Sequence, residues 1–259
     1  MEIERRFSGL ERLYGVTQAH RVMASHVVVV GIGGVGSWAA EALARSGVGR
    51  ITLIDMDHIA ESNVNRQVHA LTPTIGQSKV LAMQERIALI NAACVVQGVD
   101  DFVTPDNWPE IVPADVDAVL DACDQVRAKT AMAQWARCGR VPFITVGAAG
   151  GKRHAHRVEI ADLSETTHDP LLAQLRYRLR KFHGAPARAG TLDIACVFSR
   201  EAVAQPDASC AVQLDQTLNC HGYGSVVTVT ATFGLCAAGW VMDKISARQP
   251  VSQSNNAIL

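Results

Sequence analysis

The segment from His26 to Asp57 reads HVVVVGIGGVGSWAAEALARSGVGRITLIDMD and decides the fold. Four consecutive valines form a β-branched run, and a glycine-rich hexapeptide, Gly31 to Gly36, follows at once. A helical pattern then extends from Ser37 to Ser46, and a second apolar run, Ile51 to Ile54, ends on Asp55. This order of strand, glycine loop, helix, strand and acid predicts the nucleotide-binding half of a Rossmann-like fold.

The glycine loop suits phosphate but does not choose the nucleotide. Its glycines allow a tight turn, a close approach of backbone to phosphate, and packing of the helix on the strand. Phosphate would then bind the free N–H groups at the helix start. The glycines are Gly31, Gly33, Gly34 and Gly36, and they also satisfy the NAD fingerprint, with Asp55 at the spacing of a ribose-binding acid. The loop alone therefore leaves a dehydrogenase or a non-catalytic NAD-binding module open.

The pattern along the chain predicts an α/β protein with a mostly parallel sheet flanked by helices. Residues 1–25 resemble an amphipathic helical arm, residues 26–147 alternate strands and helices, residues 148–248 are less regular and would face substrate and a dimer partner, and residues 249–259 form a polar, flexible tail. We predict strands at 27–30, 51–55, 94–99, 117–121 and 142–146, and helices at 35–46, 77–90 and 126–138. Asp169-Pro170 is typical of a helix start.

Composition excludes several classes of protein. The 259 residues carry a net charge of −1, so the chain is not a general polyanion binder. Its seven cysteines include no C-x-x-C pair, which disfavours a zinc ribbon and predicts reduced thiols in the cytoplasm. The start of the chain is charged and has no apolar signal core. The apolar run 226–242 is barely long enough to span a bilayer, so we expect a buried or interface helix there and no stable membrane insertion.

Polar residues downstream of the glycine loop favour ATP over NAD. Arg66 and Lys79 would bring two cations to a phosphate chain, and Asp124 would bring a carboxylate suited to Mg²⁺. Since strand ends converge in a parallel sheet, these residues can meet at the loop. Hydride transfer needs no such set, whereas attack on an α-phosphate builds charge that such groups stabilise. Asp121, three residues earlier, is expected to end its strand structurally.

These residues resemble the ATP site of the ubiquitin-activating-type adenylating enzymes, the ThiF/MoeB superfamily. The resemblance spans roughly residues 5–150 and is carried by Gly31–Gly36, Asp55, Asp57, Ser62–Gln67, Lys79 and Asp121–Asp124. It implies an ATP site whose binding residues are Gly31, Gly33, Gly34, Gly36, Asp55, Asp57, Asn63, Arg66, Gln67, Lys79 and Asp124. In this site Asp55 holds ribose, Arg66 and Lys79 bind phosphates, and Asp124 binds Mg²⁺. Asn63 is a further candidate for the phosphate site, although it also suits an Asx turn.

Further stretches are similar to one family within the superfamily, the tRNA threonylcarbamoyladenosine dehydratases. They are Arg12–Gly15, Gly31–Arg45, Asn65–Leu71, Asp100–Asn107 and Cys196–Ser199. This resemblance implies ATP-dependent cyclisation of threonylcarbamoyladenosine in tRNA through an acyl-adenylate on the threonyl carboxylate. The alternative is adenylation of a ubiquitin-like sulfur-carrier protein, against which the missing C-x-x-C pairs count. The sequence departs from many relatives at Gln125, where they carry asparagine or serine, which weakens any role for that side chain.

The resemblance also implies a homodimer in which an arginine near the N-terminus reaches the partner's ATP. Arg12 is the candidate for this catalytic role beside Arg66, Lys79 and Asp124, and Arg5 and Arg6 are alternatives. A sulfurtransferase or sulfur-acceptor protein is a further possible partner.

Two basic segments and two cysteines are secondary candidates. Arg176, Arg178, Arg180 and Lys181, with Tyr177 and Phe182, predict a tRNA-facing helix or a merely solvated one. Lys152, Arg153, His154, His156 and Arg157 form a second basic candidate. Cys196 and Cys220 are possible covalent nucleophiles, although free cysteine is more often a small buried apolar residue. The histidine spacing indicates no transition-metal site.

Overall fold

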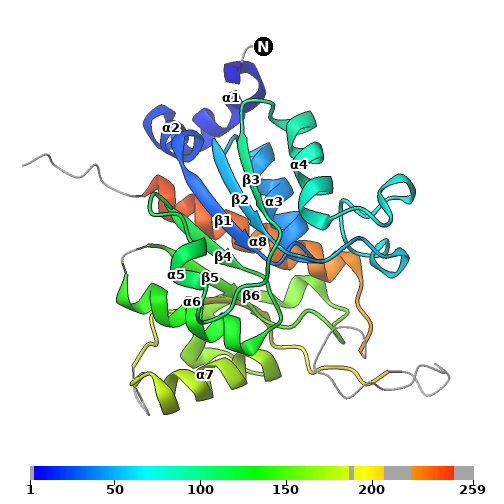
Figure 1. Cartoon of the computed structure of the whole chain (residues 1–259). Helices are drawn as coiled ribbons and strands as arrows, with labels where there is room; N and C mark the ends of the chain where they lie inside the picture. Colours follow the sequence, from blue (N-terminus) through cyan, green and yellow to red (C-terminus); the bar gives the residue numbers. More distant parts are fainter. Residues whose placement is uncertain (1–2, 140, 187–189, 207–222, 248–259) are drawn as a thin grey trace, which may run out of the picture.

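A seven-stranded sheet in the order β3-β2-β1-β4-β5-β7-β6 forms the centre of the molecule (Figure 1). The structure is a computed structural model that describes residues 3–139, 141–186, 190–206 and 223–247. Neighbouring strands are parallel except β6, which pairs with β7 in the antiparallel sense. The strands are β1 His26–Val30, β2 Arg50–Ile54, β3 Val95–Val99, β4 Ala118–Asp121, β5 Phe143–Val146, β6 Val158–Asp162 and β7 Ala195–Ser199.

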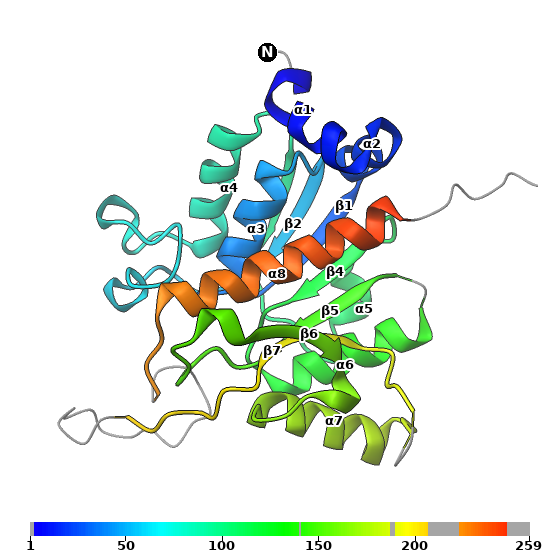
Figure 2. The same cartoon turned by 180° about the vertical axis from the view of Figure 1, so that it is seen from behind.

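Helices cover both faces of the sheet. They are α1 Ile3–Tyr14, α2 Val16–Ala24, α3 Gly36–Arg45, α4 Lys79–Ile90, α5 Trp108–Ile111, α6 Val126–Cys138, α7 Pro170–Phe182 and α8 Val227–Ser246. Helices α3, α4 and α8 lie on the face seen in Figure 2, and α5, α6 and α7 lie on the opposite face. Single 3₁₀ turns occur at Glu61–Asn63, Thr72–Thr74, Ala155–Arg157 and Leu163–Glu165.

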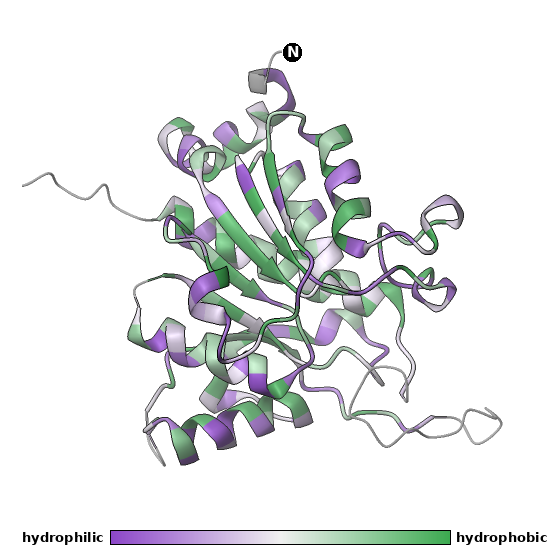
Figure 3. Cartoon of the chain, in the orientation of Figure 1, coloured by the Kyte–Doolittle hydropathy of each residue, from purple (hydrophilic) through white to green (hydrophobic). Residues whose placement is uncertain are grey.

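The valine run of β1 is explained by burial on both sides. Val27 and Val29 belong to the core beneath α3 and α8, whereas Val28 and Val30 belong to the core beneath α6 and α7. All four are at most 2% exposed. Such central parallel strands have no polar face, which is why an unbroken apolar run specifies them. Figure 3 shows the resulting apolar sheet between helices with polar outer faces.

The predicted elements of the first half are confirmed, whereas two strands of the second half were missed. Each of the five predicted strands ends within one residue of its prediction, and the three predicted helices end within two residues. The sequence did not predict β6 and β7, which extend the same sheet beyond Gly151. The N-terminal arm is two helices that meet at Gly15, whose φ of 86° favours glycine. Cys220 and the tail 249–259 lie outside the described residues.

The apolar run 226–242 forms most of α8, which packs on α3 and on the sheet. Val229, Phe233 and Val241 are fully buried on its inner side. The expectation of a buried helix is therefore confirmed. No helix in the described ranges combines the length and apolarity that crossing a bilayer requires.

A buried ion pair fixes the ends of the central strands. The Lys129 ammonium of α6 lies 3.0 Å from a carboxylate oxygen of Asp121, the last residue of β4, and both side chains are 0% exposed. The same ammonium donates to Thr145 Oγ1 at 3.0 Å and to the Val146 carbonyl at 2.8 Å, both in β5. Burial acts to lower the pKa of Lys129, but the Asp121 carboxylate, together with Cys123 and Cys196, raises that pKa above its ordinary value. Asp121 is thus structural, as expected.

We predict that Lys129→Ala lowers the free energy of unfolding by about 3–5 kcal/mol, because it leaves the Asp121 carboxylate buried without its cation. Urea titration followed by circular dichroism measures this. Arg200→Ala is the control, since the exposed Arg200–Glu159 pair at 2.9 Å should contribute at most about 1 kcal/mol. Equal losses in the two variants would contradict the role assigned to Lys129.

Candidate active site

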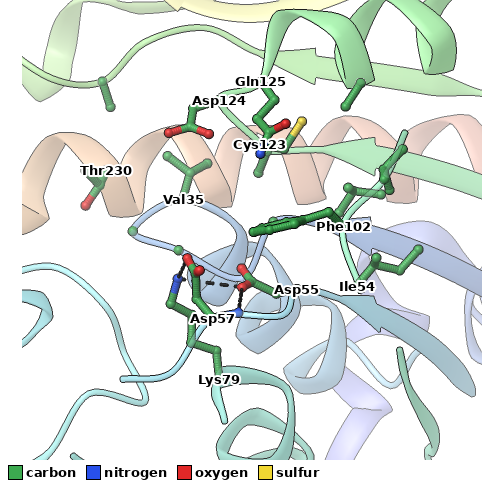
Figure 4. A pocket seen from close by; sticks show the side chains of 18 of the residues that line it. Val35, Ile54, Asp55, Asp57, Lys79, Phe102, Cys123, Asp124, Gln125 and Thr230 are labelled. Atoms are coloured by element: carbon green, nitrogen blue, oxygen red, sulfur yellow. Dashed lines mark hydrogen bonds and ion pairs between the residues drawn. The ribbon is translucent and has the colours of Figure 1, made fainter. Parts of the chain in front are cut away.

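A cavity opens at the carboxyl ends of β1, β2, β4 and β5, where parallel sheets bind ligands (Figure 4). Its wall comprises the glycine loop, the start of α4, the loop after β4, the first turn of α7 and one residue of α8. The residues predicted from sequence that line it are Gly31, Gly33, Gly34, Asp55, Asp57, Arg66, Gln67, Lys79 and Asp124. The fold therefore brings most of the predicted site together.

The glycine loop requires glycine for two different reasons. Gly31 has φ 84°, and a Cβ there would lie 2.8 Å from the Cys123 nitrogen. A Cβ on Gly36 would lie 1.8 Å from the Gly31 carbonyl oxygen, so Gly36 allows the helix start to pack on the turn. Gly36 is not part of the cavity wall. A Cβ on Gly33 would meet nothing within 4 Å, which leaves the backbone there open to a ligand.

Asp55 is held against this loop by backbone N–H groups. Its carboxylate accepts hydrogen bonds from Ile32 N at 2.7 Å and from Asp57 N at 2.8 Å. Burial raises the pKa of the Asp55 carboxyl, although Lys79 and these hydrogen bonds act in the opposite direction. The carboxylate therefore has a fixed place at the edge of the glycine loop, where a ribose would lie in a Rossmann-like site.

Lys79 stands at the first position of α4 with its ammonium in the cavity wall. Its Nζ lies 2.7 Å from the Asp57 carboxylate and 3.6 Å from that of Asp55. The backbone N–H of Lys79 donates to the Asp57 carbonyl at 3.0 Å, so strand end and helix start are clamped together. The side chain is only 8% exposed, and this restricts the ammonium to the neighbourhood of the glycine loop.

Arg66 is a cation without an acidic partner. Its Nη1 donates to the Ser62 carbonyl at 2.7 Å and to Asn65 Oδ1 at 2.9 Å, and none of the carboxylates that the structure describes forms an ion pair with it. Asn65 Nδ2 in turn donates to the Ser225 carbonyl just before α8. A Cβ on Gly34 would lie 3.1 Å from Arg66 Cγ, so the arginine stem packs against the glycine loop at Gly34.

Asp124 and Gln125 lie across the cavity from Asp55, Asp57 and Lys79 (Figure 4). Both are exposed residues of the loop after β4. None of the described residues forms a hydrogen bond or ion pair with the Asp124 side chain, which leaves its carboxylate available to a ligand. Within the described ranges, no three histidine, cysteine or acidic residues gather as a metal site.

Besides Gly36, two of the predicted residues, Asn63 and Arg12, lie outside the cavity wall. Asn63 is 6% exposed, and its Oδ1 accepts a hydrogen bond from Ala60 N at 3.0 Å. The acceptor lies three residues after the donor, so the side chain closes the 3₁₀ turn from its third position and does not form an Asx turn. Arg12 is exposed in the last turn of α1. Of its alternatives, Arg6 donates to the Ile90 carbonyl at 2.6 Å, and Arg5 is exposed.

The two basic segments, residues 152–157 and 176–182, contain both buried and exposed side chains. Arg176 donates to the carbonyls of Leu163 and Thr166 at 2.9 Å, and Lys152, 2% exposed, donates to three carbonyls, of which Glu201 O is closest at 2.7 Å. These two cations are structural. The exposed members are Tyr177, Lys181, Phe182, Arg153, His154, His156 and Arg157.

The described cysteines near the sheet ends are not activated nucleophiles. Cys196 is fully buried in β7, and burial raises its thiol pKa well above the ordinary value. Burial and the neighbouring Asp121 likewise raise the pKa of Cys123, which lines the cavity. A thiol reacts as the thiolate, so raised pKa values disfavour covalent catalysis by either residue.

Sequence reasoning missed several residues of the cavity wall. Phe102 and Asp101 enter from the segment after β3, Thr230 from α8, and Leu171 from α7. Phe102 is 41% exposed although aromatic, and it lies on the opposite side of the site from Thr230 (Figure 4). For Asp101 and Phe102 the family resemblance of Asp100–Asn107 is a signal, although it gives these residues no role. No sequence pattern indicates Thr230 or Leu171.

His69 adds no charge to this site. It is 2% exposed, and within the described chain neither ring nitrogen has a hydrogen-bond partner. Burial, together with the cations of Lys79 and Arg86, lowers the pKa of His69 to about 4. The ring is therefore neutral near pH 7, and Lys79 and Arg66 are the cations of the wall.

Comparison with known proteins identifies the family to which the chain belongs. The family model described as the ThiF family matches residues 7–258. The tRNA threonylcarbamoyladenosine dehydratase of Escherichia coli is 44% identical over 252 residues, with 94% of each chain covered. That of Haemophilus influenzae is 43% identical over 246 residues, covering 93% of this chain and 94% of the relative. The crystal structure of the E. coli enzyme in complex with ATP matches with a TM-score of 0.85 over 93% of this chain and 94% of that chain. The chain therefore belongs to the ThiF family, among its tRNA threonylcarbamoyladenosine dehydratase members.

Proposed function

We propose that this protein is an ATP-dependent dehydratase that cyclises threonylcarbamoyladenosine in tRNA. The observation that carries the proposal is the convergence of Arg66, Lys79 and the unpartnered Asp124 on a glycine loop, in a chain 44% identical to an enzyme of that name. A hydride-transfer site would not need two cations and a free carboxylate at the phosphate position. The same set suits attack on a phosphate with pyrophosphate leaving.

We propose one orientation for ATP in this cavity. The Asp55 carboxylate accepts hydrogen bonds from the ribose hydroxyls, and the backbone N–H groups of the glycine loop bind the phosphates. Arg66, Lys79 and Gln67 complete the phosphate side, and Asp57 orients the Lys79 ammonium through the 2.7 Å contact. Phe102, exposed in the wall on the side opposite Thr230, is suited to the face of the adenine ring. The Asn63 side chain acts indirectly, by shaping the turn that presents Arg66.

In the first step a threonyl carboxylate oxygen attacks the α-phosphorus of ATP. A phosphorus–oxygen bond forms, the bond to the β-phosphate breaks, and pyrophosphate leaves with an acyl-adenylate as product. Arg66 and Lys79 stabilise the charge that develops on the phosphate oxygens, which is a term of about 3–4 kcal/mol for one well-placed group.

In the second step a nitrogen or oxygen of the same modification attacks the activated carbonyl and AMP leaves. The carboxyl oxygen departs with AMP, and the attacking group loses its proton, so the modification loses one water in total. The nucleophile and the carbonyl belong to one molecule, and this proximity supplies a high effective molarity.

We further propose Mg²⁺ at Asp124 and a homodimer in the cytoplasm. The cavity wall has four aspartates, Asp55, Asp57, Asp101 and Asp124, but two cations. A triphosphate therefore needs further positive charge, which a metal ion and the partner's Arg12 would provide. Mg²⁺ commonly uses one or two carboxylates plus phosphate oxygens, which fits a lone free Asp124. Bound there, it would neutralise charge on the leaving pyrophosphate. A sulfurtransferase or sulfur-acceptor partner stays an expectation from the family resemblance.

We expect that incubation of tRNA carrying threonylcarbamoyladenosine with the protein and Mg-ATP converts the nucleoside to a product lighter by one water. Mass spectrometry of the digested nucleosides, with AMP and pyrophosphate measured in parallel, tests this. A sulfur-carrier enzyme would show exchange of pyrophosphate with ATP but no change in tRNA. NAD binding without ATP binding would end the adenylation proposal altogether.

Lys79→Ala and Asp124→Ala should each slow dehydration by about 100–1000-fold, because each removes charge stabilisation of the leaving pyrophosphate. Single-turnover rates at saturating ATP measure the loss, and thermal melting checks that the fold is retained. Asp106→Ala is the matched control, since Asp106 is exposed and lies outside the cavity wall. Full activity in Lys79→Ala would remove the lysine from the reaction.

Arg12→Ala should also inactivate the enzyme, but in a way that a partner subunit can rescue. If Arg12 acts across the dimer, mixed dimers of Arg12→Ala and Asp124→Ala subunits each regain one intact site, so random mixing restores about a quarter of the sites. Activity after denaturation and joint refolding, with subunit exchange verified by differently tagged chains, measures the recovery. No recovery in proven mixed dimers would place the arginine in its own subunit's site or give the role to another residue.

A further inference from the structure

The C-terminal half of α7 presents a surface group of aromatic and cationic side chains, which we call the α7 cluster: Tyr177, Arg178, Lys181 and Phe182. Arg178 is half-buried, and the other three are exposed. Both aromatic residues are 56% exposed. The Lys181 ammonium lies 5.3 Å from the Tyr177 ring centre and 5.2 Å from that of Phe182, and it donates to the Tyr177 hydroxyl at 2.8 Å. The Arg178 guanidinium lies 5.6 Å from the Phe182 ring centre. The cluster is thus a preformed aromatic and cationic surface.

The cations of this cluster are uncompensated. Helix α7 contains four basic residues and no acidic one. Arg176 and Arg180 are occupied by backbone carbonyls. None of the carboxylates described forms an ion pair with Arg178 or Lys181. Arg178 Nε is buried and has no hydrogen-bond partner among the described residues. The whole chain carries a net charge of −1, so this positive surface is a local feature.

The same helix also reaches the active site. Leu171 in its first turn lines the cavity, and its N-cap Asp169 accepts a hydrogen bond from Ala148 N, another cavity residue, at 2.9 Å. Six to eleven residues separate Leu171 from the members of the cluster, so at 1.5 Å per residue the cluster lies about 9–17 Å from the cavity wall along one rigid helix. Figures 1 and 2 show α7 along the lower edge of the molecule, with its outer face clear of other elements.

We propose that the α7 cluster binds a single-stranded, looped part of the tRNA substrate, next to the nucleotide held in the cavity. Bases stack on Tyr177 and Phe182, and phosphates contact Arg178 and Lys181. This inference rests on the proposed function and adds the surface that holds the RNA.

Charge and chemistry favour RNA as the occupant. Unpaired bases of RNA loops stack on aromatic rings and on guanidinium planes, and phosphates pair with neighbouring cations. A duplex alone would offer its backbone to the cations and leave the two exposed rings without partners. An RNA loop can use the rings and the cations at once. An RNA strand with one nucleotide in the cavity would pass along α7 to reach the cluster.

The test is the affinity for tRNA carrying threonylcarbamoyladenosine, measured by fluorescence anisotropy at several salt concentrations. Arg178→Ala with Lys181→Ala should weaken binding by about tenfold or more, and should reduce the slope of log affinity against log salt by about 1.4–1.8, as expected for two lost phosphate contacts. Tyr177→Ala with Phe182→Ala should weaken binding by about fivefold to a hundredfold with an unchanged slope, because stacking carries no counterion release.

Matched variants separate binding from folding. Lys244→Ala removes a cation that lies 5.3 Å from the Trp240 ring centre on α8, and it should leave tRNA affinity unchanged. Tyr177→Phe with Phe182→Tyr keeps both rings and should bind nearly as the wild type does. Lys181→Glu, at an exposed position, should weaken binding further than Lys181→Ala. Each cluster variant should retain the wild-type melting temperature and ATP affinity. At saturating tRNA the variants that weaken binding should retain kcat with a raised KM.

Wild-type tRNA affinity in both double variants would overturn the α7 surface while leaving the dehydratase intact; this is also the result expected if the cluster docks a protein instead. Failure of the wild type to bind any tRNA, with ATP still bound, would overturn the proposed function itself. An equal loss of affinity in Lys244→Ala would show that any surface cation acts alike, and would equally overturn the specific role of α7.

Discussion

The buried ion pair between Lys129 and Asp121 is the interaction on which one whole wall of the active site depends. The ammonium joins Asp121 at the end of β4 to Thr145 and Val146 of β5, and it comes from α6. Removing a charge from water costs several kcal/mol, and the cost is offset only where opposite charge and hydrogen bonds surround it. Here a carboxylate, a hydroxyl and a carbonyl do so, while Cys123 N and Thr145 Oγ1 donate to the same carboxylate. The loop that carries Asp124 therefore begins from a rigid point, although Asp124 itself is exposed.

The opposite wall is organised by carboxylates that hold cations and backbone in place. Asp55 anchors the glycine loop, and Asp57 holds the Lys79 ammonium, so the lysine is positioned before any nucleotide enters. Preorganised charge is effective because it needs no rearrangement when the transition state forms. Arg66 is held differently, by Asn65, which also contacts the segment before α8. A rearrangement of that segment would therefore change the position of the Arg66 guanidinium.

The strength of the sequence signal follows the physical situation of each residue. Strands β1, β2 and β4 are buried on both sides and read as apolar runs, and the glycine loop has steric requirements that few other structures share. By contrast, β6 is an antiparallel edge strand with an irregular burial pattern, and β7 is a short run between turn residues. Phe102, Thr230 and Leu171 line the cavity only because distant elements meet there. Arg176 could not be assigned from sequence either, since its partners, Leu163 and Thr166, belong to the turn before α7.

The choice between ATP and NAD shows where the decisive information resides. A glycine loop with an acid after the second strand serves any nucleotide that has phosphate and ribose, because backbone N–H groups recognise phosphate and carboxylates recognise hydroxyls. The groups that separate the two chemistries lie beyond that unit: Lys79 on α4, Arg66 in the segment before it, and Asp124 after β4. They are scattered in sequence, and only the parallel order of β2, β1 and β4 brings them to one edge. The sheet topology, more than the glycine motif, is thus what converts a general nucleotide fold into a site suited to adenylation.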